Sequence, residues 1–189
     1  MRAIQAVVVA TSLASPAFLL AQAPVDTTVK QAAYARVTLA HAVASDPEIR
    51  KAVAAKNAEG ESQQAIERKD REWTTTPSLR KAFTGSPCAD RLREMTRADP
   101  LVVEVILMDE HGANVCISRE TSDYWQGDEA KWQKTFVEGH DPFVDEPALD
   151  ASSATFAVQL SVPVTEGPRR IGALTLSLRV RKDVAPPGR

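Results

Sequence analysis

Apolar residues in the first half of the chain recur every three or four positions, which is the spacing of one face of an amphipathic helix. In the longest such run the apolar positions are Val29, Ala33, Val37, Ala40 and Ala44. This run predicts a long helix over residues 29–44 as the first element of the fold.

Capping residues and helix breakers divide the segment that follows. Asp46 can cap a new helix, with Pro47 at its first position and Glu48 near the positive end of the helix dipole. We therefore expect a helix over 47–56. Polar breaks that contain Gly or Pro then separate three further predicted helices, which span residues 63–73, 78–83 and 89–97.

After Asp99 and Pro100 the helical spacing gives way to runs of apolar and β-branched residues. Residues 101–108 are almost continuously apolar, which is typical of a strand covered on both faces. A turn over 109–112 and a second strand over 113–118 complete a predicted hairpin.

A second hairpin is predicted nearer the C-terminus. Its strands span residues 155–164 and 170–180, and the second strand alternates in its later part so that one face is apolar. Between the two hairpins we expect a short helix over 128–136 and a loop over 139–150 that is rich in Gly, Pro and Asp.

The order of these elements predicts an α+β layer fold, in which a long N-terminal helix and several short helices pack on an antiparallel sheet of four to five strands. The length of the chain suits a single domain with one core. We expect a helical region over 24–100, a sheet region over 101–182 and a disordered tail over 183–189.

The first 23 residues have the pattern of a secretory signal. Arg2 supplies a basic start, residues 6–20 an apolar stretch, and Ala21, Gln22 and Ala23 a small-residue cleavage site. Cleavage after Ala21 is an alternative, because a proline follows Ala23. The segment predicts export to the periplasm. Its retention as a membrane anchor stays open as a second interpretation.

The charge of the chain argues against a nucleic-acid partner. The formal net charge is −2, and Arg2 is the only charged residue before Pro24, so loss of the signal makes the chain slightly more acidic. Binding to phosphates needs clustered Lys and Arg. The basic residues near the end, Arg179, Arg181 and Lys182, are too few for that.

Cys88 and Cys116 would enter an oxidising compartment after export. The sequence leaves open whether they form a disulfide or stay as two buried thiols, and no Cys or His spacing suggests a metal site. His41, His111 and His140 fall in a predicted helix, turn and loop. With no nucleophile motif and no glycine-rich phosphate loop, we expect neither enzymatic activity nor a cofactor.

Three strings of the sequence resemble the Cache family of extracytoplasmic sensor domains. They are the hairpin VVEVILMDEHGANVCIS, the segment TSDYWQGDEAKWQKTF and the closing strand RRIGALTLSLRV. The resemblance spans about residues 29–180 and implies a PAS-like sheet preceded by a long helix. Receptors of this family carry flanking membrane helices and a signalling domain. The present sequence ends at Arg189, so we expect either that a membrane receptor or kinase partner reports occupancy or that the chain has a simple binding role.

By position, the resemblance also implies a small-molecule pocket between the sheet and the segment after the first hairpin. Its predicted lining is Tyr124, Trp125, Asp128 and Trp132, with Asp145 from the later loop. Aromatic rings beside carboxylates suit a ligand with an ammonium group.

Each of these residues also has a plainer interpretation. Both tryptophans can be core residues, Asp128 can cap a helix, and Asp145 can be an ordinary loop carboxylate. Arg119, at the end of the second strand, can anchor a carboxylate of the ligand or lie in solvent.

The resulting hypothesis is a periplasmic sensor domain for a small polar metabolite such as an amine, an amino acid or a carboxylate. The alternative is a non-enzymatic protein-interaction module with no small-molecule ligand.

Overall fold

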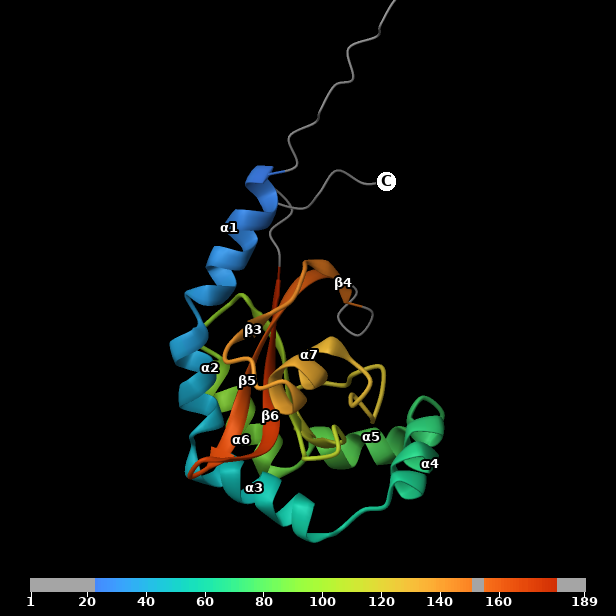
Figure 1. Ribbon diagram of the computed structural model, residues 1–189. Coiled ribbons are helices and arrows are strands. Elements are labelled where there is room, and N and C mark those ends of the chain that lie inside the picture. Colours follow the sequence, from blue (N-terminus) through green and yellow to red (C-terminus); the bar gives the residue numbers. More distant parts are fainter. Residues whose placement is uncertain (1–22, 151–154, 180–189) are drawn as a thin grey trace, which may run out of the picture.

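The computed structural model describes residues 23–150 and 155–179 (Figure 1). The predicted signal segment, apart from its last residue, and the predicted tail lie outside the described residues. Within them, no helix is both long and apolar enough to cross a membrane.

An antiparallel sheet forms the centre of the molecule, in the order β2-β1-β6-β5-β3, with β4 also paired to β5. The six strands are β1 (Val102–Met108), β2 (Asn114–Ile117), β3 (Phe143–Val144), β4 (Ala148–Asp150), β5 (Thr155–Glu166) and β6 (Arg169–Arg179). The predicted α+β class is confirmed. The two short strands β3 and β4 lie where the sequence predicted a loop.

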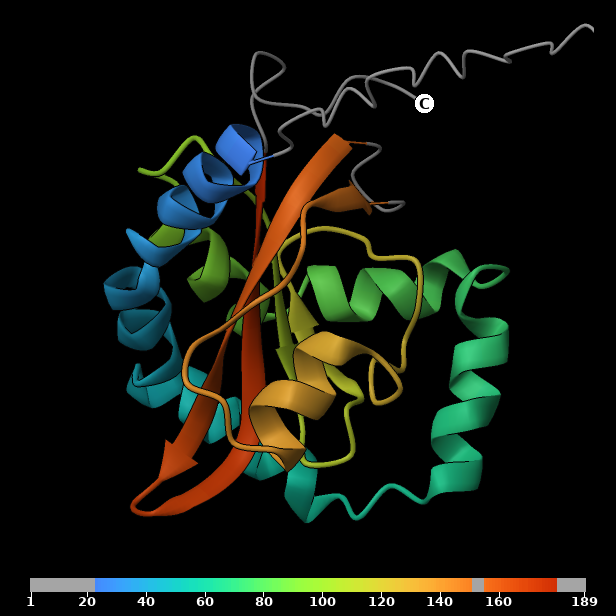
Figure 2. The same cartoon turned by 45° about the horizontal axis from the view of Figure 1, so that its top comes forward.

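Helices cover both faces of this sheet (Figures 1 and 2). One face is covered by α1 (Ala23–Tyr34), α2 (Val37–Ala44), α3 (Pro47–Ala58) and α6 (Pro87–Thr96). The other side carries α4 (Gln63–Trp73), α5 (Pro77–Thr84), the short α7 (Ala130–Trp132) and the π-helix η1 (Gln133–Val137). We call these the helical face and the covered face.

The prediction of one long helix over 29–44 is wrong, because the chain turns at Ala35 and Arg36 between α1 and α2. Arg36 stabilises this turn. Its Nη1 donates to the Ala32 carbonyl at 2.7 Å, near the end of α1, and its Nε lies 2.7 Å from the carboxylate of Asp99. The two shorter helices can therefore each lie along the strands.

The predicted cap of α3 is confirmed. The carboxylate of Asp46 accepts hydrogen bonds from the backbone N–H groups of Glu48 at 3.0 Å and Ile49 at 3.3 Å. Arg91 of α6 binds the same carboxylate at 2.7 Å. The hydrogen bond to Arg91 is the main cause that lowers the pKa of Asp46, against the opposing effect of burial.

A disulfide joins Cys88 of α6 to Cys116 of β2, with their Cα atoms 6.0 Å apart. Of the two possibilities that the sequence left open, the bonded pair is present. The bond connects the helical face to the strand at one edge of the sheet.

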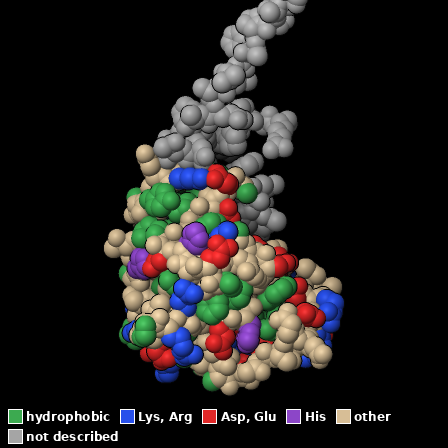
Figure 3. Space-filling view, viewed as in Figure 1, with side chains coloured by type: hydrophobic (Ala, Val, Ile, Leu, Met, Phe, Trp, Pro, Cys, Tyr) green, Lys and Arg blue, Asp and Glu red, His purple; other side chains and the backbone are tan. Residues whose placement is uncertain are grey.

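The described surface carries mixed charge. On the side seen in Figure 3, acidic and basic side chains are interspersed with apolar and uncharged ones.

Candidate functional site

The two faces of the sheet differ in chemistry. On β5 and β6, Val158, Leu160, Val162, Leu174 and Leu176 point to the helical face and are at most 1% exposed. Because side chains alternate along a strand, the residues between them point to the covered face. Several of these alternate positions are polar.

Four buried polar side chains form a row on the covered face, which we call the polar row: Glu104 of β1, Ser161 of β5, and Thr175 and Ser177 of β6. Ser161 pairs with Thr175 across the strands, and their hydroxyl oxygens are 2.8 Å apart. The Ser177 hydroxyl donates to the Glu104 carboxylate at 3.3 Å. All four are at most 1% exposed, so the row is shielded from water.

Residues 121–137, which we call the covering segment, follow β2, include α7 and η1, and lie over the covered face (Figure 2). Within this segment, η1 contacts β5 and β6, the strands that carry three members of the polar row. Thr135 of η1 is fully buried, and its hydroxyl has no hydrogen-bond partner.

Two amide side chains near the start of the covering segment also have an unpartnered oxygen. Asn114 Nδ2 and Gln126 Nε2 both donate to the carbonyl of Asp123, each at 2.9 Å. That shared acceptor fixes the orientation of both amides. Their oxygens are buried and accept no hydrogen bond.

These three atoms stand out within the part of the chain that the structure describes. Four buried side-chain nitrogen or oxygen atoms there lack a hydrogen bond, and three belong to Asn114, Gln126 and Thr135. The fourth, Arg36 Nε, has the carboxylate of Asp99 at 2.7 Å. Unpartnered buried polar atoms are rare in folded proteins and call for a physical reason. Here they gather in and beside the covering segment.

The predicted site residue Tyr124 is fully buried in an aromatic cluster, with ring centroids 5.6 Å from Trp73 and 5.3 Å from Phe83. Its hydroxyl donates to Glu61 at 2.7 Å. Burial, and then the hydrogen bond to Glu61, raise the pKa of Tyr124. The phenol therefore stays neutral and holds the covering segment to the loop before α4.

Glu61 is a hub of charged contacts beneath that phenol. Burial would raise the pKa of Glu61, but hydrogen bonds from Lys56, Lys69 and Tyr124 outweigh it and lower the pKa to about 2. The Lys56 Nζ lies 2.8 Å from Glu61 and also 2.8 Å from Glu59. The hub is ionised at neutral pH.

Trp125 and Trp132, also predicted, both donate their indole N–H to the β1–β2 turn. Trp125 Nε1 bonds to the carbonyl of His111 at 2.9 Å, and Trp132 Nε1 bonds to the carbonyl of Asp109 at 3.1 Å. Trp132 is 9% exposed and stacks on Phe136 at 5.1 Å between centroids, whereas Trp125 is only half-buried. Both indoles anchor the covering segment to the turn.

The backbone of the turn comes very close to the covering segment. Gly112, at a φ of +78°, leaves so little room that an added Cβ would lie 2.4 Å from the Cα of Gly127. Asp109 holds the turn, because its carboxylate accepts from the N–H groups of His111 at 2.8 Å and Ala113 at 2.9 Å. Burial raises the pKa of Asp109.

The other predicted site residues lie apart from this cluster. Asp128 is exposed and does not cap α7, whose N-cap is Glu129. Asp145 follows β3, where its N–H donates to the Gln159 carbonyl at 2.9 Å and its carboxylate accepts from Glu146 at 2.7 Å. Arg119 is exposed and lines a different cavity, beside α6.

Sequence reasoning thus found the aromatic part of the covered face and missed its polar part. Asn114, Gln126, Thr135 and the polar row were not predicted. A signal for the row was present, because Ser161, Thr175 and Ser177 alternate with apolar residues, and Glu104 interrupts an apolar run.

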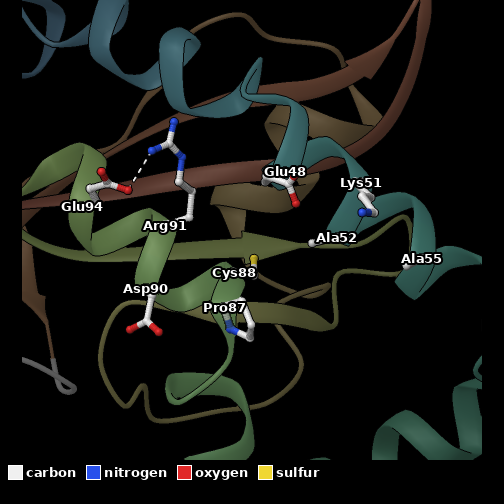
Figure 4. A pocket seen from close by; sticks show the side chains of 9 residues that line it. All are labelled: Glu48, Lys51, Ala52, Ala55, Pro87, Cys88, Asp90, Arg91 and Glu94. Atoms are coloured by element: carbon white, nitrogen blue, oxygen red, sulfur yellow. Dashed lines mark hydrogen bonds and ion pairs between the residues drawn. The ribbon is translucent and has the colours of Figure 1, made fainter.

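A hollow of about 600 Å³ lies between α3 and α6 on the helical face (Figure 4). Ala52, Ala55, Pro87 and Cys88 supply its apolar lining. Its charged lining residues include Arg91, which pairs with Glu94 at 2.8 Å. Among the described residues, no group of three or more acidic, His or Cys side chains is placed to hold a metal ion.

Comparison with known proteins gave similarity only among solved structures; no protein-family model matches, and no curated protein matches. The sensor domain of the Vibrio cholerae histidine kinase DctB superposes with a TM-score of 0.46 at 14% identity, over 82% of this chain and 50% of that one. The ligand-binding domain of the Campylobacter jejuni chemoreceptor Tlp3, in complex with L-norvaline, gives 0.43 at 13% identity, over 81% and 60%.

The ligand-binding domain of the Pseudomonas fluorescens chemoreceptor CtaA, in complex with L-valine, gives a TM-score of 0.42 at 16% identity, over 82% of this chain and 56% of that one. The present chain therefore spans between half and two thirds of the length of these structures.

Proposed function

We propose that this chain is a periplasmic, non-enzymatic sensor module that binds a small polar metabolite between the sheet and the covering segment. The ligand class is an amine, an amino acid or a carboxylate. Tyr124, Trp125 and Trp132 hold the covering segment in place over the ligand. Asp128, on the exposed side of that segment, and Asp145, which follows β3, remain the candidate acidic groups of the site.

One observation carries this proposal: in and beside the covering segment, three polar side-chain atoms are buried without a hydrogen-bond partner. An interface built only for stability would bury apolar groups there, because an unpaired buried hydroxyl or amide costs about 1–3 kcal/mol. A ligand with polar groups supplies the missing partners. Pockets that bind small molecules combine apolar walls with a few such polar atoms.

The chemistry of the unpartnered atoms favours a ligand with hydrogen-bond donors. The amide oxygens of Asn114 and Gln126 can only accept, whereas the hydroxyl of Thr135 can donate or accept. An ammonium group suits two such acceptors, and the neighbouring rings of the covered face add cation–π attraction. Amines and amino acids are therefore the first compounds to test.

A sensor must also change when it is occupied. Binding beneath the covering segment would favour one of two arrangements of that segment relative to the sheet and to the helices packed on it. A partner such as a membrane receptor or kinase would read that difference.

The test is a thermal-shift screen of amines, amino acids and carboxylates, followed by calorimetric titration of each hit. A ligand at one hundred times its dissociation constant should add about 2.7 kcal/mol to the free energy of unfolding. The variant Thr135→Val keeps the shape of the side chain and removes its hydroxyl, and it should weaken binding about three- to tenfold. Thr38→Val, on the exposed side of α2, is the matched control.

Two results would count against the proposal. One is a screen in which no compound raises the melting temperature. The other is a hit whose affinity is the same in Thr135→Val and in the unchanged protein.

The second candidate function is a protein-interaction module without a small-molecule ligand. The open hollow between α3 and α6 favours it, since small apolar side chains at its base leave room for a side chain of a partner. This alternative predicts no thermal shift with metabolites. It also predicts that Ala55→Trp, which would fill the hollow, weakens binding of the protein partner.

A further inference from the structure

Three arginines from two elements line one cavity of about 370 Å³ at the edge of the sheet, which we call the arginine cavity. Arg93 and Arg97 come from the last turn and the C-cap of α6, and Arg119 follows β2. The start of β1, at Val102 and Val103, forms an apolar part of the wall.

Arg93 is held in place by its own contacts. Its Nη1 donates to the carbonyl of Ser118 at 2.9 Å, and its Nη2 donates to Asp90 at 2.6 Å. This guanidinium ties α6 to the end of β2. It therefore fixes the distance between the two elements that carry the other arginines.

The guanidinium groups of Arg97 and Arg119 are not neutralised by an ion pair among the described residues. Both are exposed, and neither has an acidic partner among the described residues. The contact of Arg119 is a weak one, from Nη1 to the carbonyl of Val103 at 3.4 Å. Arg97 also favours the C-terminal end of α6 through the helix dipole, but that effect gives no reason for Arg119 to line the same cavity.

The two acidic residues of the cavity wall are already engaged. Asp99 pairs with Arg36 at 2.7 Å. Glu104 is 1% exposed and accepts the hydroxyl of Ser177 at 3.3 Å. Among the described residues, neither acid forms an ion pair with Arg97 or Arg119.

We propose that the arginine cavity is a binding site for a small oxyanion, held by the guanidinium groups of Arg97 and Arg119. Guanidinium presents planar pairs of N–H donors that match the oxygens of a carboxylate or a phosphate. The shared chemistry is an anion with two or more oxygens. This site is separate from the proposed metabolite site beneath the covering segment.

The experiment is isothermal titration calorimetry of the whole chain with inorganic phosphate, sulfate and succinate, each at the same total ionic strength. The double variant Arg97→Gln with Arg119→Gln should bind at least tenfold more weakly, because it loses charge-assisted hydrogen bonds. The matched control is Arg68→Gln with Arg71→Gln, which removes two exposed arginines from α4 and should leave the affinity unchanged.

The three anions distinguish between the two possible classes of ligand. Binding of phosphate and sulfate without succinate assigns the site to tetrahedral oxyanions, and binding of succinate assigns it to carboxylates. Equal melting temperatures of the two double variants would show that the comparison is between folded proteins.

The proposal is overturned if none of the three anions binds at millimolar concentration, or if both double variants lose affinity equally. The variant Thr135→Val should bind the anion normally. Failure of the metabolite site and failure of the arginine cavity are thereby told apart.

Discussion

The two faces of the sheet are built from the same strands but bury different kinds of side chain. On the helical face, apolar side chains such as Leu160 and Leu174 meet the helices in one continuous cluster. On the covered face, some residues of the sheet are hydroxyls or a carboxylate, among apolar ones such as Ile106 and Met108, and the segment over them buries unpartnered polar atoms. We therefore expect the helical face to contribute most of the stability, and the proposed function places binding on the covered face.

The largest expected effect is on the helical face. Leu160→Ala should lower the free energy of unfolding by about 3–5 kcal/mol, because Leu160 is fully buried and its loss leaves a cavity. Urea denaturation followed by circular dichroism measures this. A loss below about 1 kcal/mol would mean that the helical face is not the main source of stability.

The next effect concerns the ionised hub that holds Tyr124 on the covered face. The pKa of Glu61 is lowered to about 2 in the folded protein. A lowered pKa stabilises the fold above the pKa of the unfolded chain, and that stability is lost as the pH falls through about 4 towards 2. The contribution is on the order of 3 kcal/mol at neutral pH.

Glu61→Gln should therefore be less stable than the unchanged protein at pH 7, and the difference should close as the pH approaches 2. Urea denaturation at several pH values measures it. Glu72→Gln, on the exposed side of α4, serves as the control and should show no such pH dependence. A difference that stays constant from pH 7 to pH 2 would show that ionisation of Glu61 does not stabilise the fold.

The smallest effects are expected within the covered face itself. Ser161→Ala breaks the hydroxyl pair with Thr175 and should cost about 1 kcal/mol. Thr135→Val removes a hydroxyl that has no partner, so stability should stay the same or rise by up to about 1 kcal/mol. Thermal melts of both variants measure these changes in stability. A larger loss of stability in Thr135→Val than in Ser161→Ala would contradict a polar binding site on this face.

Much of the fold could be predicted from local signals. The cap at Asp46 with Pro47 placed α3, and the polar breaks placed α4 to within its observed ends at Gln63 and Trp73. The turn at Arg36 was missed because it depends on Asp99, which is distant in sequence. The strands β3 and β4 were missed because each is short and forms only by pairing with β5.

The candidate site was predictable only in part. The aromatic content of the covering segment identified Tyr124, Trp125 and Trp132 as candidates. It did not predict that their polar groups bind Glu61 and the β1–β2 turn. The alternation of Ser161 and Thr175 with apolar residues gave the direction of those side chains. The alternation could not show that these side chains are buried. Their burial depends on η1, and tertiary packing sets the position of η1 over β5 and β6.

The two indole hydrogen bonds to the β1–β2 turn restrict how a metabolite could enter the proposed site. They tether the covering segment at the end next to Asp109 and His111, so that end moves together with the hairpin. At the opposite end the chain leaves η1 through Gly139, at a φ of +81°. At that end Arg170 of β6 donates to the carbonyl of Val137 at 3.4 Å. A metabolite that enters above the serine and threonine hydroxyls must displace η1 from β6, so we expect η1, beyond the tethering tryptophans, to be the part of the segment that moves most.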